Sequence, residues 1–225
     1  MNKVSVILLA AGTGSRFGEK KQFKKLNGSP IWTYSLDTFN KSNCFQEFIL
    51  VVSKDSLNEL KNSEEFYQFS KKINIKLVCG GNLRQDSVYN GLQLVDENNN
   101  IICIHDAARP FVKQKHIKEV IEACSIFDGS ILAIPATDTI KKMQDGIVEK
   151  TIDRDSIWMA QTPQAFQKEK LLHAIELGSN IKITDESMLM ELAGYNIKII
   201  SGDSINLKIT RKIDWELAKI IESEK

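Results

Sequence analysis

Histidine, cysteine and proline are all scarce in this sequence, whose 225 residues include 3 His, 4 Cys and 4 Pro. The four cysteines stand singly, without a Cys-x-x-Cys pair and without a histidine at ligand spacing, so no zinc site is expected. Three of them lie within apolar stretches, where a free thiol behaves as a small hydrophobic side chain: Cys79, Cys103 and Cys124. We therefore expect reduced cysteines and a cytoplasmic protein.

The sequence also lacks a large net charge and a long apolar run. Its 30 Lys and Arg residues balance 29 Asp and Glu residues, so the formal charge of +1 gives no long-range attraction to nucleic acid or an acidic membrane. No apolar run approaches the ~20 residues of a membrane-spanning helix. The first such run, residues 4–11, has no basic flank and indicates a buried strand. These absences predict a soluble protein that binds neither nucleic acid nor a membrane.

Short apolar runs alternate with amphipathic stretches along the whole chain. The runs are continuous and rich in β-branched residues, as is typical of strands covered on both faces. They comprise residues 4–9, 48–52, 75–78, 101–104, 130–134 and 197–200. Helical periodicity occupies residues 30–39, with Ser29 as N-cap, and residues 56–69, 85–94, 115–127 and 213–221. This alternation predicts an α/β fold with a doubly wound, mostly parallel sheet.

Residues 139–151 break this rhythm, because extended-type residues flank an Asp145-Gly146 turn signal. A hairpin here has no partner in a parallel sheet, so we expect an arm at about residues 137–155 that covers its edges on another surface. A homodimer in which each arm clasps the other subunit is our hypothesis, and a flap over the same subunit is the alternative. Without repeats or linkers, residues 1–225 are expected to form one domain that carries this arm.

A glycine-rich loop, LAAGTGSRFG at residues 9–18, follows the first predicted strand. Glycines at the carboxyl end of a parallel strand let backbone N–H groups approach phosphate oxygens. The G-x-G-x-x-x-G spacing, with Arg16 inside and Lys21 after it, matches neither the dinucleotide fingerprint nor the P-loop. Only five of the basic residues are arginines, and arginine binds phosphate through two donors. The loop therefore predicts triphosphate binding, with a simple connecting turn as the alternative.

Two further motifs follow predicted strands. CGGNLRQDS at residues 79–87 has a double glycine, and the side chains of Asn82 and Ser87 suit the hydrogen-bonding edge of a base. Its alternative is a tight turn in which Asn82 or Asp86 caps a helix. HDAARP at residues 105–110 places Asp106 at a strand mouth, where a carboxylate can hold Mg²⁺ or a sugar hydroxyl. The alternative is a simple ion pair between Asp106 and Arg109.

Nine strings in a fixed order, spread over nearly the whole chain, resemble one family. They are LAAGTGSRFG with KKQF, GGNLRQDSV, HDAARP, ATDT, DR, QTPQAF, TDES and NLKITR. The chain is similar in these strings to the 2-C-methyl-D-erythritol 4-phosphate cytidylyltransferases of the non-mevalonate isoprenoid pathway. Ribitol 5-phosphate cytidylyltransferases are similar in architecture but usually carry Ser-Val at Ala107-Ala108. The resemblance implies a Rossmann-like nucleotidyltransferase fold and attack of the sugar phosphate on the α-phosphorus of CTP, which expels pyrophosphate.

Carried over position by position, the resemblance implies site residues of three kinds. Those around the reacting phosphorus are Arg16, Lys21 and Lys208. Those around the nucleotide are Ala10, Ala11, Gly12, Gly14, Gly81, Asn82, Ser87 and Ala107. Those around the sugar alcohol are Asp106, Arg109, Thr139, Arg154, Thr162 and Thr184, with Thr139 and Arg154 on the arm of the neighbouring subunit. Mg²⁺ or another divalent cation is implied, bound mainly by CTP phosphates and also by Asp106.

Several points stay open at this stage. Asn82 stands where many relatives carry Asp, so we expect a CTP preference that is weaker or depends more on the backbone. The alternative for Thr184 is a helix N-cap. Arg84 and Arg211 receive no chemical step. The other functions are transfer to ribitol 5-phosphate or another polyol phosphate, a non-catalytic nucleotide-binding regulator, and a hydride-transferring dehydrogenase. The basic, differently spaced first loop argues against the dehydrogenase.

Overall fold

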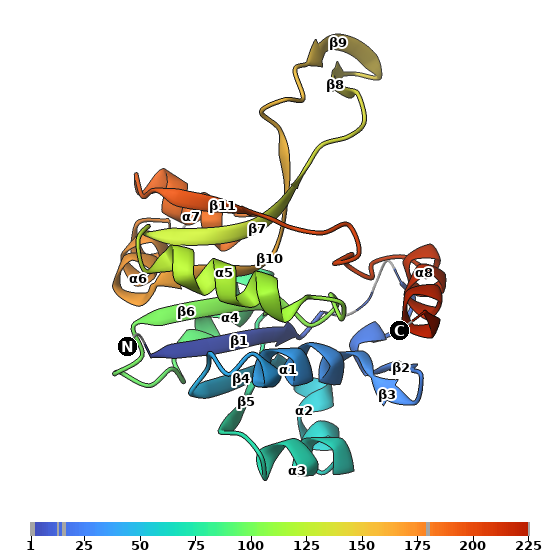
Figure 1. The fold of residues 1–225 in the computed structure, drawn as a ribbon, viewed down its shortest axis with the longest axis vertical. Coiled ribbons are helices and arrows are strands. Elements are labelled where there is room, and N and C mark those ends of the chain that lie inside the picture. Colours follow the sequence, from blue (N-terminus) through green and yellow to red (C-terminus); the bar gives the residue numbers. More distant parts are fainter. Residues whose placement is uncertain (1–2, 13, 15–16, 179–180, 225) are drawn as a thin grey trace.

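A computed structural model describes residues 3–12, 14, 17–178 and 181–224, and a seven-stranded sheet runs through its centre in the order β11-β7-β10-β6-β1-β4-β5 (Figure 1). The strands are β1 (Val4–Ala10), β4 (Glu47–Val52), β5 (Ile75–Cys79), β6 (Ile101–Asp106), β7 (Gly129–Pro135), β10 (Trp158–Gln167) and β11 (Ile197–Ser201). All six predicted strands are present. The ladders β1–β4, β1–β6, β4–β5 and β11–β7 are parallel, which confirms the mostly parallel fold.

Strand β10 was not predicted, and it pairs antiparallel with both β6 and β7. Its sequence, WMAQTPQAFQ, has few β-branched residues and contains Pro163, both of which argue against a central strand. The ladder with β7 shifts register between Ala160 and Gln164, and Pro163 lies within this irregularity. A bulge tolerates a residue without an N–H donor, because the ladder is locally interrupted there.

Helices cover both faces of the sheet, and alternate residues of β1 serve the two sides. Val4, Val6 and Leu8 belong to a core with α1 (Ile31–Lys41), α2 (Lys54–Lys61), α3 (Glu64–Ser70) and α5 (Gln114–Cys124). Ile7 belongs to the opposite core with α4 (Arg84–Leu92), α6 (Lys168–Leu177) and α7 (Glu186–Leu192). Figure 1 shows α1 and α5 on the near face. Burial on both sides explains why the central strands read as continuous apolar runs.

Two helix predictions were wrong in detail. The first helix begins at Ile31 with Pro30 as its N-cap residue, whereas Ser29 pairs in a short ribbon of β2 (Lys25–Leu26) and β3 (Ser29–Pro30). The stretch 56–69 forms two helices instead of one. The hydroxyl of Ser63 accepts from Phe66 N at 3.2 Å and caps α3, so a local side-chain bond ends one helix and starts another. Helix α6 was not predicted, and a helix at the position of α7 was raised only through the alternative in which Thr184 is an N-cap.

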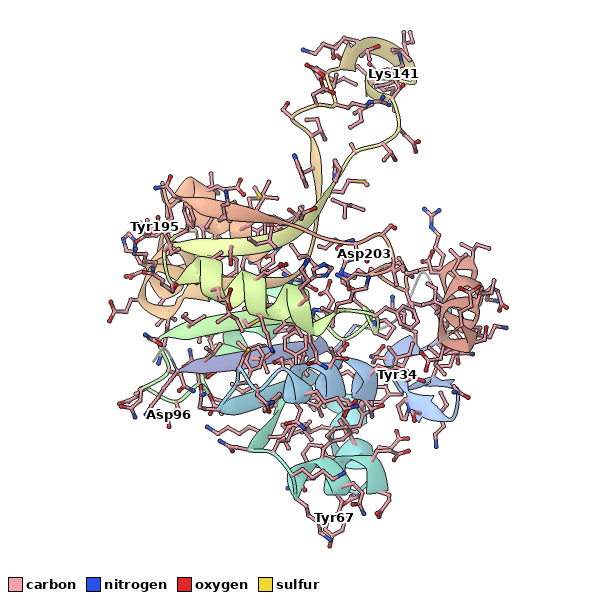
Figure 2. The ribbon with its side chains drawn as sticks, viewed as in Figure 1. Tyr34, Tyr67, Asp96, Lys141, Tyr195 and Asp203 are labelled. Carbon is pink, nitrogen blue, oxygen red and sulfur yellow. The ribbon has the colours of Figure 1, made fainter. Side chains whose placement is uncertain are left out.

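The hairpin consists of β8 (Ile140–Gln144) and β9 (Ile147–Ile152), which pair only with each other. Asp145 and Gly146 have φ of 50° and 83°, as the tight turn of a two-residue hairpin requires. The hairpin projects from the body of the molecule and carries Lys141 (Figure 2). The predicted projecting arm is therefore confirmed. Of the helices in the described residues, none is long and apolar enough to cross a membrane.

Candidate active site

The glycine-rich and acidic motifs meet at one edge of the sheet. Parallel registers align Ala10 with Val52 and Val52 with Cys79, while Leu9 aligns with Asp106. The ends of β1, β5 and β6 therefore lie at the same edge. The pairing of β1 with β6 extends one residue past the end of β6, because Ala107 N donates a hydrogen bond to Leu9 O at 3.0 Å. The carboxyl edge of a parallel sheet is where ligands bind in such folds.

Gln22 holds the first loop against β1. Its side chain is buried, and its amide donates to Ala10 O at 2.7 Å and Gly12 O at 2.8 Å. Gly14 has φ of 72°, and a Cβ there would lie 1.8 Å from Glu19 O, so only glycine fits. Lys21 is half-buried and begins the short helix η1 (Lys21–Phe23) beside Gln22. The predicted Arg16 lies outside the described residues.

The second loop packs against the first and caps its own helix. A Cβ on Gly80 would lie 2.5 Å from Ala11 Cβ, so glycine permits the two loops to approach. Asp86 accepts from Leu83 N at 2.9 Å, which confirms the capping alternative for Asp86, whereas Asn82 is exposed and precedes the N-cap Leu83. The hydroxyl of Ser87 accepts from Gly81 N and donates to Leu83 O, both at 3.2 Å. With its proton used, that hydroxyl can only accept a further hydrogen bond.

Asp106 sits at the centre of a charged cluster. Its carboxylate lies 2.7 Å from Lys208 Nζ, 3.4 Å from Arg84 Nε and 3.8 Å from Arg109 Nε. Burial opposes ionisation, yet Lys208 and then the two arginines hold the pKa of Asp106 well below its ordinary value. The ion pair with Arg109 thus exists but is the longest of three. Asp106 is therefore ionised at pH 7 and lies among three cations at the end of β6.

Lys208 reaches Asp106 because hydrogen bonds from the residues before and after it hold the segment 206–209 in place. The side chain of Asn206 is fully buried and donates to Thr162 O at 2.9 Å, while Asn206 O accepts from Arg109 Nη1 at 2.9 Å. Ile209 N donates to Ala108 O at 2.9 Å, and the Ile209 side chain packs in a small core with α8 (Lys212–Ser223). Residues 206–209 therefore cross the carboxyl edge as irregular backbone. Asn206, which the sequence did not single out, anchors this crossing.

A buried hydrogen-bond chain runs beside the cluster. His105 Nε2 lies 3.1 Å from Arg109 O, and because a carbonyl only accepts, Nε2 carries the proton. Nδ1 then accepts from the Thr162 hydroxyl at 3.0 Å, and that hydroxyl accepts from Asp106 N at 3.0 Å. Burial lowers the pKa of His105 to about 4, so its ring is neutral at pH 7. The hydroxyl of Thr162, a predicted sugar ligand, therefore already donates its hydrogen bond to another residue of the protein.

Arg84 and Glu186 form the contact that sequence reasoning missed. Arg84 Nη1 donates to both carboxylate oxygens of Glu186, at 2.8 and 2.6 Å, and the Glu186 side chain is 1% exposed. Asp185 caps α7 by accepting from Met188 N at 3.3 Å, so the alternative in which Thr184 is the N-cap is wrong, and Thr184 is exposed. The scarcity of arginine was the available signal for Arg84; the contact joins residues too distant in sequence to be inferred locally.

A family model described as 2-C-methyl-D-erythritol 4-phosphate cytidylyltransferase matches residues 4–224. The chain belongs to this family. A 2-C-methyl-D-erythritol 4-phosphate cytidylyltransferase from Halalkalibacterium halodurans is 35% identical over 225 residues, covering 98% of this chain and 97% of that protein. The bifunctional enzyme IspD/IspF from Desulfotalea psychrophila is 40% identical over 227 residues; this chain is covered completely but spans 58% of that protein's length.

Solved structures agree in fold with the family assignment. The crystal structure of 4-diphosphocytidyl-2C-methyl-D-erythritol synthase from Anaerococcus prevotii has a TM-score of 0.88 and 30% identity, covering 99% of this chain and 96% of that one. The 2-C-methyl-D-erythritol 4-phosphate cytidylyltransferase from Francisella tularensis has a TM-score of 0.80 and 33% identity, covering 97% and 99%. These neighbours confirm the predicted fold class over 97% or more of this chain.

Among the described residues, those expected on the arm make no hydrogen bond or ion pair with the Asp106 cluster. Thr139 and Arg154 are both exposed at the base of the hairpin, where Arg154 Nη1 donates to Thr137 O. By contrast, Asp106, Arg109, Thr162 and Lys208 are joined by the contacts above. The arrangement agrees with arm residues that serve another subunit, although their roles stay predictions.

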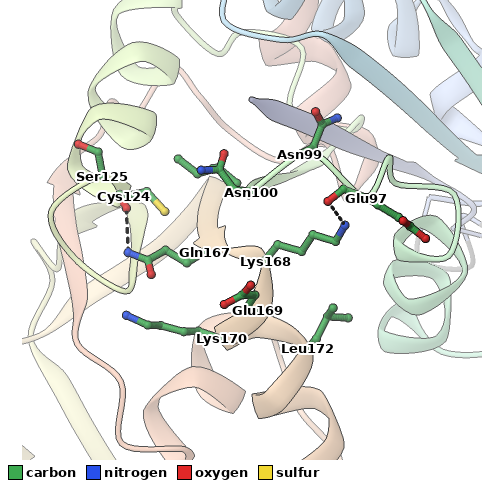
Figure 3. Close-up of a pocket in the computed structure, with 11 residues that line it drawn as sticks. Glu97, Asn99, Asn100, Cys124, Ser125, Gln167, Lys168, Glu169, Lys170 and Leu172 are labelled. Carbon is green, nitrogen blue, oxygen red and sulfur yellow. Dashed lines mark hydrogen bonds between the residues drawn. The ribbon is translucent and has the colours of Figure 1, made fainter. Parts of the chain in front are cut away.

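A cavity of about 570 Å³ lies at the opposite edge of the sheet (Figure 3). It is lined by Ile101 at the start of β6 and Gln167 at the end of the antiparallel β10, and Lys168 Nζ donates to Glu97 O at 3.3 Å across it. Figure 3 shows lysine, glutamine and asparagine side chains around this space. Because ligands of parallel sheets gather at the carboxyl edge, this cavity is not the candidate active site.

Proposed function

We propose that this chain joins CTP to 2-C-methyl-D-erythritol 4-phosphate, giving 4-diphosphocytidyl-2-C-methyl-D-erythritol and pyrophosphate. Membership of the family over residues 4–224 supports this reaction. The single observation that supports this reaction at the level of atoms is the 2.7 Å contact between Lys208 Nζ and Asp106, which lies beside two glycine-rich loops. An oxygen of the sugar phosphate forms a bond to the α-phosphorus, and the bond from that phosphorus to the bridging oxygen breaks as pyrophosphate leaves.

The residues around the phosphorus act by charge and alignment. The attacking phosphate is ionised at pH 7, so no general base is needed, and negative charge grows on the phosphoryl oxygens as the bonds exchange. We assign Lys21, Lys208 and Arg16 to stabilise this charge, each by ~2 to 4 kcal/mol. Asp106 keeps the Lys208 ammonium oriented. His105 is assigned no proton transfer, because it is fully buried and both of its ring nitrogens are hydrogen-bonded within the protein.

The two glycine-rich loops are proposed to hold CTP. The loops approach closely at Gly80, where a Cβ would lie 2.5 Å from Ala11 Cβ, and we assign the cytosine base to the surface that the two loops form together. The nucleotide contacts are assigned to Ala10, Ala11, Gly12, Gly14, Gly81, Asn82, Ser87 and Ala107. The acceptor contacts are assigned to Asp106, Arg109, Thr162 and Thr184, with Thr139 and Arg154 from a second subunit. Because the Thr162 hydroxyl already donates to His105, Thr162 would accept a hydrogen bond from the sugar alcohol.

Mg²⁺ fits this edge as a companion of CTP. Among the described residues, no group of three or more His, Cys, Asp or Glu side chains could hold a metal alone. Magnesium commonly takes one or two carboxylates together with substrate phosphates and water, and Asp106 offers one such carboxylate. Since cations already surround Asp106, we assign most of the ligands to CTP and water. When bound, the ion neutralises charge on the triphosphate.

We further propose that two copies exchange arms. Met143, Ile147 and Val148 on the arm are 60%, 74% and 57% exposed, and such apolar side chains gain by being covered. Sedimentation at micromolar concentration tests this: a dimer that Ile147→Asp converts to a monomer is expected, and a wild-type monomer would overturn the exchange.

The four free cysteines support a reducing compartment such as the cytoplasm.

Pyrophosphate release with purified chain, Mg²⁺ and CTP tests the proposed reaction. We expect release with 2-C-methyl-D-erythritol 4-phosphate and at least about a hundredfold lower kcat/KM with ribitol 5-phosphate, a difference of roughly 3 kcal/mol. A preference for ribitol 5-phosphate would overturn the acceptor. Binding of CTP without release on any polyol phosphate would identify a nucleotide-binding regulator instead.

A further inference from the structure

The Arg84–Glu186 contact links two helices that approach the site from different sides. Arg84 is the first residue of α4, directly after the second glycine loop, and Glu186 is the first residue of α7, two residues after Thr184. The Glu186 carboxylate is 1% exposed and accepts twice from Arg84 Nη1. The other edge of the same guanidinium faces the active site, because Arg84 Nε lies 3.4 Å from Asp106 Oδ1.

Opposite charges therefore alternate along one line from α7 to the reacting edge. Glu186 binds Arg84, Arg84 approaches Oδ1 of Asp106, and Oδ2 of Asp106 binds Lys208 at 2.7 Å. A guanidinium is planar, so fixing Nη1 also fixes the direction of Nε. Glu186 therefore sets the orientation of the Arg84 guanidinium plane. That plane in turn sets the orientation of the Asp106 carboxylate, whose Oδ2 binds Lys208.

We propose that Glu186, acting through Arg84, is a positioning residue that keeps Asp106 turned toward Lys208 for the transfer reaction. Without Glu186, the guanidinium would be free to rotate and bind both oxygens of Asp106, which is the geometry that arginine and carboxylate prefer. Oδ2 would then leave Lys208. The inference rests on the proposed function for its kinetic consequence, while the geometry of the four groups stands independently.

The fold supplies other means for holding these helices. Asp185 already caps α7, and α7 packs through Leu189 and Met190, which are 5% and 0% exposed. Asp86 already caps α4. A buried ion pair is weak support for stability, because removing two charges from water offsets most of their attraction. Neither helix needs the buried Glu186 carboxylate as a cap. A role in orienting Asp106 explains why this carboxylate is present.

A double-mutant cycle on Glu186→Gln and Arg84→Gln tests the inference, measured as kcat/KM for 2-C-methyl-D-erythritol 4-phosphate. Each single variant is expected to lower kcat/KM by about ten- to a hundredfold, the effect of one hydrogen bond to a charged group, with KM for CTP changed by less than about threefold. Because Glu186 acts through Arg84, the double variant is expected to be no worse than the poorer single one. Multiplied losses in the double variant would overturn the inference.

Glu47→Gln is the matched control. Glu47 is another buried carboxylate paired with a cation, 2.6 Å from Lys76 Nζ, but it lies at the start of β4, away from the reacting edge. It is expected to lower the melting temperature without changing kcat/KM. If it changes kcat/KM as much as Glu186→Gln does, the loss reflects general destabilisation and the positioning role is wrong.

A crystal structure of Glu186→Gln separates failure of this inference from failure of the proposed function. The expected result is Arg84 bound to both oxygens of Asp106 and Lys208 Nζ beyond hydrogen-bonding distance of Oδ2. An unchanged Lys208–Asp106 contact would overturn the positioning role even in an enzyme of different activity. An inactive wild-type chain would overturn the proposed reaction alone. If Glu186→Gln does not fold, Arg84→Lys provides the same comparison, since one ammonium cannot bind Glu186 and Asp106 as a planar fork does.

Discussion

The ammonium of Lys208 lies 2.7 Å from a carboxylate oxygen of Asp106, and this contact joins the end of β6 to the irregular segment before α8. The Lys208 side chain is 37% exposed, whereas that of Asp106 is 9% exposed. An ammonium has three donors, so Lys208 can keep its buried partner and still turn a donor toward a bound phosphate. Asp106 thus holds in place a cation that solvent can reach.

Replacing Lys208 tests its charge directly. Lys208→Ala is expected to lower kcat at least about a hundredfold, because a preorganised charge near the phosphorus contributes ~2 to 4 kcal/mol. Lys21→Ala is expected to behave alike. Steady-state pyrophosphate release is the measurement, and Lys170→Ala, which breaks an ion pair with Asp128, is the control. A folded Lys208→Ala protein with near wild-type kcat would remove this residue from the mechanism.

Arg154 is expected to act on the acceptor alone. Arg154→Ala should raise KM for the sugar phosphate at least about tenfold, the loss of one charged hydrogen bond, while KM for CTP stays nearly unchanged. Lys141→Ala on the same arm removes an exposed cation that donates to Thr151 at 2.7 Å, and it serves as control. An equal rise in both KM values for Arg154→Ala would contradict the assignment.

His105 makes stability depend on pH in weak acid. Burial lowers its pKa to about 4 from an ordinary value of 6.5, so the unfolded chain binds more protons between these values. The stabilisation is complete above pH 6.5 and is lost as the pH falls toward 4, by up to about 3 kcal/mol. His105→Gln can keep both hydrogen bonds without titrating. Urea unfolding at several pH values should give a smaller acid loss for the variant; parallel curves would refute this role.

Glu47 makes a second contribution, at the other edge of the sheet. Burial raises its pKa, but the bonds from Lys76, Ser5 and the Asp96 backbone outweigh this and lower the pKa below its ordinary value of 4.5. The stabilisation is therefore present above pH 4.5 and is lost as the pH falls below it. Glu47→Gln is expected to lower the free energy of unfolding at pH 7 by about 1 to 3 kcal/mol. Unchanged stability of the variant at pH 7 would contradict this prediction.

Local sequence patterns predicted much of the fold. The six parallel strands were visible because burial on both faces requires continuous apolar runs, and the hairpin because Asp145-Gly146 can adopt positive φ. Strand β10 was not visible, since its composition is neutral and Pro163 disfavours a central strand. The division of residues 56–69 depends on one hydroxyl bond at Ser63, which periodicity does not report.

The site divides in the same way. Motif order and strand ends were sufficient to bring the glycine loops and Asp106 to one edge, because parallel strands share their direction. The Glu186–Arg84–Asp106–Lys208 line was decided by the tertiary structure. Its members come from α4, α7, β6 and the segment before α8, and only folding removes the water that would otherwise keep such charges apart. The sequence alone determined which chemical groups reach the edge; long-range packing decided which of them touch.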